Sequence, residues 1–545
     1  MRKMGWLFGA ALLVAASVPA LAQDQAAQIK QDVEDFLKPL AGAGAAGEEA
    51  MLSHGAIDVA AAGGAYVVTI PDLQWLPDTS GHFEIGTVSF SLTPEGADLY
   101  HIADVKIPAE IPHKTADGGT DGSISLPSQQ FTGVWSRPLQ TFMQLDADLR
   151  DVKVVDTTDN FTLALGEIAA KVASTDKGNG RWDQDGTLHL SALNVSSPEG
   201  LVTLGSLDAA SNTRDYNAKG WSAVRDRMEA MTESAEGGAP TPAALPDPQL
   251  AAALRAASPL FASSNTTITA GAFSLRDAAG AEEFTLPTSA LSFGAEGFDQ
   301  AVGRLTLALS HTGLAVGDIP PVDQDLLPRD LAINIALENL PVQELWKGAV
   351  DTLSSADMST DQGTGMAMMM FMQLLQQSLV AGKAHINVTD SHLALALARA
   401  QLGGVIEASA ESMFGGVGKM TVDVTGLDPL IDAVIAHGGG PQSEEAAGLQ
   451  MARGFSNRQT GTDGTVTDHY DIELTPQGQV LVNGKEFSFM GPSTSEAPPD
   501  SGMGPDAGAP PADGTTGDAP PPPATDGSDG DTSNGNSGDT TGSGN

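Results

Sequence analysis

The chain contains no cysteine among its 545 residues. This absence excludes disulfides, a cysteine nucleophile and a lipid anchor attached to cysteine, so packing and hydrogen bonding alone must stabilise the fold. Large eukaryotic secreted domains usually carry disulfides. If the chain is exported, a bacterial periplasmic or secreted protein is therefore the better interpretation.

Basic residues are also scarce, at 27 Lys and Arg against 69 Asp and Glu, which gives a net charge of −42. Such a field repels nucleic acid and anionic lipid surfaces, so we expect no nucleic-acid partner. Two explanations of the acidity stay open. An acidic surface stays hydrated in salty surroundings, and carboxylates can also bind cations.

Aromatic residues make up only 5% of the chain, which is few for a carbohydrate-binding platform. The sequence has no Gly-x-Ser-x-Gly nucleophile elbow, no P-loop and no His-Glu-x-x-His metal site. We therefore predict no catalytic residue, no metal site and no cofactor. A hydrolase that uses a pair of carboxylates stays open, because carboxylates are abundant and no pair stands out.

The N-terminus has the three parts of a secretory signal peptide. Arg2 and Lys3 precede an apolar run at 4–18, and Ala20-Leu21-Ala22 provides a small-x-small cleavage site. The run is shorter than the roughly 20 residues that span a membrane, although an uncleaved anchor stays open. We expect residues 1–22 to direct export and to be removed, leaving no integral membrane segment.

Composition divides the remaining chain into four parts. Residues 23–235 and 249–490 are predicted to form N-terminal and C-terminal β-rich domains, joined by a linker at 236–248 that is rich in Gly, Ala and Pro. Residues 491–545 consist mainly of Pro, Gly, Asp, Ser and Thr. This last segment has too little apolar surface to fold and is predicted to be a disordered acidic tail.

Apolar and polar residues alternate in both predicted domains, as at 331–338, which indicates strands. Gly86 lies where this alternation changes phase, which predicts a β-bulge. One amphipathic helix is predicted from a stripe through Ile29, Val33 and Leu37. Residues 333–346 loosely resemble 421–434, each running from a strand through a proline corner into a helix, and 186–195 resembles 303–316. We expect a strand-dominated α+β fold, an extended antiparallel sheet of repeated strand-strand-helix units, unless these matches are chance.

The stretch 366–375 is apolar at nearly every position. A helix that is apolar on all sides must be buried or must face something apolar. It is either a core helix beneath the sheet or a surface for an apolar ligand or partner, for which flexible methionine is suited. The candidate surface consists of Met366, Met368, Met369, Met370 and Met372.

The segment 470–485, Tyr-Asp-Ile-Glu-Leu-Thr-Pro-Gln-Gly-Gln-Val-Leu-Val-Asn-Gly-Lys, resembles the final hairpin of the YdgA-like bacterial envelope proteins of unknown function. The general layout is similar to that of the AsmA-type envelope proteins, which are linked to lipid homeostasis. The resemblance implies an envelope location and supplies no catalytic residue.

Three functions stay open on this basis. The chain is expected to be an exported, non-enzymatic envelope protein that binds or shields a lipid, an envelope protein or another apolar partner. The alternatives are a hydrolase of envelope polymer that uses unidentified carboxylates, and a purely structural component of the envelope.

Overall fold

A computed structural model describes residues 21–37, 51–78, 81–96, 98–234, 247–317, 319–355, 360–437 and 440–487. The predicted signal peptide and the predicted linker lie outside these residues except for the last two positions of each, and the predicted tail lies outside them entirely. The contacts of the chain separate residues 1–489 from 490–545, and all the described residues belong to the first unit.

The fold is strand-dominated, with 56% of the described residues in strands and 23% in helices. The described strands belong to one large sheet, and neighbouring strands pair antiparallel. The predicted fold class, a strand-rich α+β protein with an extended antiparallel sheet, is confirmed at this level.

The strands of the first half are β1 (Leu52–Ser53), β2 (Asp58–Ala62), β3 (Ala65–Asp78), β4 (Gly81–Glu95), β5 (Leu99–Lys106), β6 (Glu110–Thr115), β7 (Thr120–Ser125), β8 (Ser128–Ser136), β9 (Thr141–Asp156), β10 (Phe161–Gly178), β11 (Arg181–Ser197) and β12 (Gly200–Asn217). Those of the second half are β13 (Ser263–Asp277), β14 (Glu282–Glu296), β15 (Gly303–Thr312), β16 (Ala315–Val316), β17 (Asp330–Leu340), β18 (His385–Ala394), β19 (Arg399–Ala408), β20 (Gly416–Thr425), β21 (Asn457–Thr460), β22 (Val466–Leu474), β23 (Val480–Val482) and β24 (Lys485–Phe487). The helices are α1 (Leu21–Leu37), α2 (Ala218–Ser234), α3 (Pro248–Ala257), α4 (Pro321–Asp325), α5 (Val342–Ser355), α6 (Asp361–Ala381), α7 (Leu427–His437) and α8 (Glu444–Phe455).

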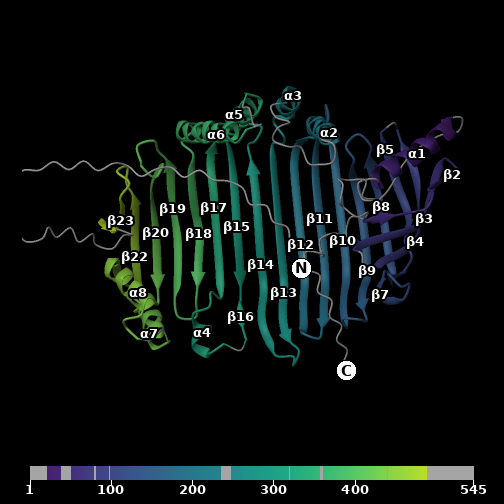
Figure 1. Cartoon of the computed structure of the whole chain (residues 1–545). Coiled ribbons are helices and arrows are strands. Elements are labelled where there is room, and N and C mark those ends of the chain that lie inside the picture. Colours follow the sequence, from purple (N-terminus) through teal and green to yellow (C-terminus); the bar gives the residue numbers. More distant parts are fainter. Residues whose placement is uncertain are drawn as a thin grey trace, which may run out of the picture. The chain divides into compact units, whose positions relative to one another are not determined.

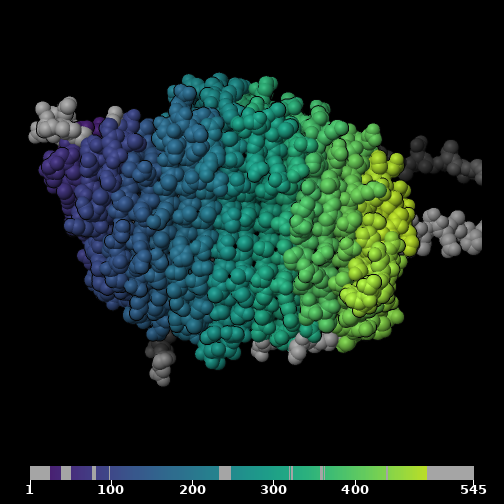
Figure 2. All heavy atoms as spheres, turned by 180° about the vertical axis from the view of Figure 1, so that it is seen from behind, coloured from purple at the N-terminus to yellow at the C-terminus, as the bar shows by residue number. Residues whose placement is uncertain are grey.

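From β9 onward the sheet follows the chain. Each of β9 to β14 pairs with the strand that follows it, and the order then continues from β15 through β17, β18, β19, β20 and β22. The sequence colours accordingly run in order across the sheet in both views (Figures 1 and 2). β12 and β13, which flank the predicted linker, pair along their lengths, so the sheet continues across the boundary that we predicted between two domains.

The best-buried core lies under α1 at the first strands. Ile29 and Val33 of α1 are fully buried, and they belong to one cluster with Tyr66, Leu92 and Ile102 of β3 to β5. The predicted amphipathic helix is thus confirmed. The predicted bulge is confirmed as well, because the register of β3 and β4 shifts at Gly86, whose φ of 79° favours glycine.

The helices that follow α1 lie at the two ends of the strands. Figure 1 shows α2, α3, α5 and α6 in a row along one end, called here the α2–α6 end, and α4, α7 and α8 at the other. The row is tied together by Trp346 Nε1 of α5, which donates to the Leu254 carbonyl of α3 at 3.1 Å, and by the ion pair of Arg255 with Asp351 at 2.9 Å.

The repeated strand-strand-helix unit is not confirmed. Both proline corners do lead from a strand into a helix, β17 into α5 and β20 into α7. However, β17 and β20 are three antiparallel pairings apart and run in opposite directions, so these two helices lie at opposite ends of the sheet. Equivalent units of a repeat would place them at the same end.

Candidate functional site

The two faces of the sheet differ sharply in chemistry. Residues that are opposite one another in antiparallel strands share a face, and the face alternates along each strand. One cross-strand row over six neighbouring strands, β11 to β15 and β17, is entirely apolar; its members are Leu188, Ala209, Ile268, Leu291, Leu309 and Ile333. We call the face that carries this row the apolar face.

The adjacent row on the other face is polar or small throughout. It consists of Lys171, Thr187, Ala210, Thr267, Ser292, Ala308 and Asn334 of β10 to β15 and β17. Charged side chains on this polar face pair across strands, as Lys171 does with Asp146 at 3.1 Å and Lys419 with Glu473 at 3.2 Å. Water is the natural neighbour of such a face.

The apolar face lacks a covering layer over its central strands. Of the described hydrophobic residues between Ala257 and Ala336, none is buried. Phe293 is 53% exposed, and Leu305, Leu307 and Leu309 of β15 are each at least 36% exposed. A continuous exposed apolar surface of this kind is typical of an interaction site.

A hollow of about 440 Å³ lies on this face near the α2–α6 end. Its wall includes Phe293 of β14, Leu305 and Leu307 of β15, and Ile335 and Leu337 of β17. The volume lies within the range of small-molecule sites, roughly 300–1,000 Å³. We therefore take the apolar face and this hollow as the candidate site.

The methionine-rich segment forms the middle of α6, and its methionines are exposed. Met369 is 71% exposed, and Met366, Met368, Met370 and Met372 are all more than half exposed. The core-helix alternative is therefore wrong for these side chains. The helix packs on α5 through Leu374, which lies so close to Gly348 that an added Cβ there would come within 1.9 Å of it.

The inner side of α6 is small and narrow, which explains the exposure. Ala367 and Ser378 are buried on it, at 4% and 2% exposed, and Phe371 and Leu374 are half-buried. Because α6 contacts α5 along this one stripe, nothing among the described residues covers its remaining sides. After Asp361 the helix contains no charged residue.

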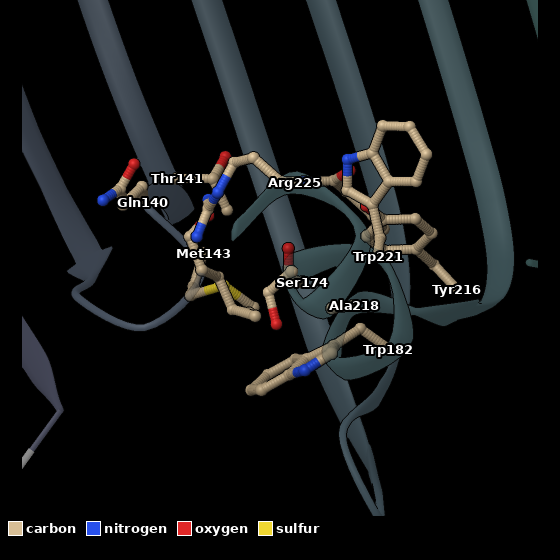
Figure 3. A pocket seen from close by; sticks show the side chains of 12 residues that line it. Gln140, Thr141, Met143, Ser174, Trp182, Tyr216, Ala218, Trp221 and Arg225 are labelled. Atoms are coloured by element: carbon tan, nitrogen blue, oxygen red, sulfur yellow. The ribbon is translucent and has the colours of Figure 1, made fainter. Parts of the chain in front are cut away.

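A second cavity, called here the end pocket, lies where α2 meets β9 to β12 (Figure 3). Its volume is about 340 Å³, and its lining includes Trp182, Tyr216, Trp221 and Arg225 around Ser174. Burial raises the pKa of the Tyr216 hydroxyl, and the nearby Arg225 opposes that shift. The hydroxyl therefore stays protonated and can donate a hydrogen bond.

Several histidines of the polar face are bound to carboxylates. His469 Nδ1 lies 2.7 Å from Asp423 Oδ1, and this hydrogen bond raises the pKa of His469. His189 and Asp208 form a similar pair at 2.6 Å. Within the part of the chain that the structure describes, no three His, Asp or Glu side chains are placed to hold a metal ion.

No protein-family model, curated protein or solved structure matches this chain. Among the described helices, none combines the length and the apolar character needed to span a membrane. The assignment of the candidate site therefore rests on the geometry of the described residues.

The sequence shows the alternation of apolar and polar residues along single strands. It does not show that the apolar residues of several strands form one surface. Assigning Leu307, Phe293 and Ile335 to one face requires the register of three strands, and the register becomes visible only in the sheet. The end pocket was missed for the same reason, because its residues come from five successive elements and only the register of the strands and the turn into α2 bring them together. The only available signal was the spacing of Trp182, Tyr216 and Trp221 within a chain poor in aromatics.

Proposed function

We propose that this chain is an exported, non-enzymatic envelope protein that binds the acyl chains of lipids on the apolar face of its sheet. The observation that carries the proposal is the absence of any buried hydrophobic side chain among the described residues between Ala257 and Ala336. About 25 cal/mol is gained for each Å² of apolar surface removed from water, so this face favours an apolar occupant.

An acyl chain fits this face better than a polypeptide does. The strands β10 to β15 are hydrogen-bonded on both sides, so their backbones offer no free edge on which a peptide strand could add. A peptide laid flat on the apolar face would bury its own N–H and C=O groups without partners, at a cost of several kcal/mol. An acyl chain has no such groups.

The dimensions also agree. Neighbouring strands lie about 4.8 Å apart, so the apolar row over six strands spans roughly 24 Å. That length accommodates an extended acyl chain lying across the strands. The hollow lined by Phe293 and Leu307 has room for part of this chain.

The methionine surface of α6 belongs to the same proposal. We propose that Met366, Met368, Met369, Met370 and Met372 contact a lipid surface. Acyl chains would then enter the apolar face at the α2–α6 end. Methionine adapts to irregular apolar partners, and a helix without charge after Asp361 tolerates an uncharged lipid surface. The net charge of −42 favours neutral over anionic lipids. The resemblance of the 470–485 hairpin to YdgA-like envelope proteins points to the same compartment.

Native mass spectrometry of the full chain, purified without detergent from the periplasm of an expressing bacterium, tests the proposal. We expect mass additions that correspond to one or more lipids and that disappear after organic extraction. If the protein carries no lipid and takes up none from neutral vesicles, the proposal is wrong.

A further inference from the structure

We propose that the end pocket binds an uncharged, hydroxyl-rich head group, a sugar or another polyol, of the lipid whose chains occupy the apolar face. The inference rests on the proposed function for the position of the chains. It adds the chemical class of the lipid and the direction in which the lipid lies.

The end pocket opens on the apolar face and continues it. Met143, Ser174 and Gln184 line the pocket and lie two residues along their strands from Leu145, Val172 and Gly186, which share the apolar face. α2 closes the pocket at the α2–α6 end, with Trp221, Ser222 and Arg225 in its wall (Figure 3). A lipid on the apolar face thus reaches the pocket without crossing a barrier of other elements.

The same face turns polar on the way to the pocket. Ser174, Gln184, Thr213 and Ser264 form one cross-strand row on β10 to β13. Thr213 and Ser264 share a hydrogen bond of 3.1 Å. An apolar centre followed by a row of hydroxyl and amide groups orients an amphipathic molecule with its head toward the α2–α6 end.

Neutral hydrogen-bonding groups and aromatic rings dominate the lining. Three of the ten Trp and Tyr residues of the chain, Trp182, Tyr216 and Trp221, gather here. Such rings offer an apolar face to the C–H side of a sugar ring together with a polar N–H or O–H. Gln140, Thr141, Ser174, Gln184 and Ser222 add side chains that both donate and accept.

Ser174 supplies an independent sign of a missing partner. Its Oγ is buried and makes no hydrogen bond with the described residues, although it lies between Arg225 and Trp182 in the pocket (Figure 3). An unsatisfied buried hydroxyl is unfavourable, so a ligand group that bonds to it would remove a penalty that the folded chain carries.

The charges favour an uncharged head group. Arg225 is the one charged residue of the lining, and its guanidinium is already paired with Asp226 at 2.9 Å and donates to the Leu139 carbonyl at 3.0 Å. Glu229 lies 3.9 Å from the same guanidinium. An anionic head would meet these two carboxylates and the net charge of −42, whereas a cationic head would meet Arg225.

Isothermal titration calorimetry of the full chain with three probes of equal chain length tests this inference. The probes are dodecyl maltoside, dodecylphosphocholine and laurate, each below its micelle concentration. We expect the maltoside to bind about tenfold more tightly than the other two, a factor that a few additional contacts supply. Trp221→Ala and Ser174→Ala should each lower that preference, while Phe414→Ala, an exposed aromatic outside the pocket, should leave it unchanged.

The outcomes separate the two proposals. If the three probes bind equally, or if the preference for maltoside survives both pocket substitutions, the head-group inference is wrong and the proposed function stands. If none of the probes binds, the acyl-chain proposal itself fails. Ser174→Ala removes an unpaired buried hydroxyl, so its melting temperature should equal or exceed that of the wild type and a loss of preference cannot be attributed to unfolding.

Discussion

At the scale of single residues, the chemistry of this protein depends on which side of the sheet a side chain occupies. Leu307 and Leu309 are more than a third exposed, although each is a large aliphatic residue in a central strand. Burial normally stabilises such a side chain by about 1.5–3 kcal/mol, and here the folded chain alone does not gain that amount in full. A ligand that covers these side chains can gain the remaining free energy of burial.

A charge placed on the apolar face should abolish ligand binding and leave the fold intact. Leu307→Asp puts a carboxylate into the hollow, where an acyl chain would have to desolvate it. We expect binding of a fluorescent fatty acyl probe to weaken at least tenfold. Leu307 is 36% exposed, so the variant also loses some packing, but its strand stays hydrogen-bonded on both sides and the protein should remain folded. Ser310→Asp adds the same charge to the polar face of the same strand, and equal losses of binding in both variants would contradict the assignment of the faces.

The pair of His469 and Asp423 makes stability depend on pH. The hydrogen bond that His469 Nδ1 donates to Asp423 Oδ1 raises the pKa of His469 above its ordinary value of 6.5. A raised folded pKa contributes stability that is fully present below pH 6.5 and is lost as the pH rises through the folded pKa. Urea unfolding between pH 5.5 and about 9 should show this decline in the wild type, and Asp423→Asn should flatten it. A decline of equal size in the variant would assign it to other groups.

At the scale of elements, α6 shows how an apolar helix can stay outside the core. We expect Met369→Asp to leave the free energy of unfolding almost unchanged, since Met369 is 71% exposed. Ala367→Asp should instead destabilise the protein by several kcal/mol, because Ala367 is 4% exposed and the carboxylate would be buried without a partner. Chemical denaturation measures both. If Met369→Asp proves as destabilising as Ala367→Asp, the methionines are part of a core after all.

Asp247 joins α2, the helix that closes the end pocket, to the start of α3. Asp247 Oδ1 accepts from the N–H groups of Gln249 and Leu250 at the start of α3, and its other oxygen is bound to Arg227 of α2. Asp247→Ala removes both interactions and should cost about 1–2 kcal/mol. Asp247→Asn keeps the cap and should cost less. Equal unfolding free energies for the wild type and the alanine variant would contradict this role.

The sequence predicted some of these elements well and others poorly, for identifiable reasons. Local periodicity was enough to predict α1, whose Ile29 and Val33 are buried as expected. It was also enough to predict the strand over 331–338. Whether the methionines of α6 are buried or exposed depends on which elements cover that helix. The periodicity of its own sequence does not contain this information. The end pocket combines Met143 with Trp221, and only the sheet register and the turn into α2 bring them together.

At the scale of the whole molecule, the described chain is a sheet with a well-buried core under α1 and a largely uncovered apolar face beyond it. Proteins bury such faces against a second layer. The row Leu188 to Ile333 has no such layer among the described residues, and the polar face behind it carries ion pairs between neighbouring strands. We propose that a lipid supplies the second layer of this face.

Photo-crosslinking with a lipid that carries a diazirine in its acyl chain tests the central claim most directly. After irradiation of the loaded full chain, we expect mass-spectrometric mapping to place adducts on Phe293, Leu305, Leu307 and Ile335 of the apolar face. The polar-face neighbours Ser292, Ala308 and Asn334 should remain unlabelled. Adducts spread equally over both faces, or confined to α6, would contradict the claim that the sheet holds the chain.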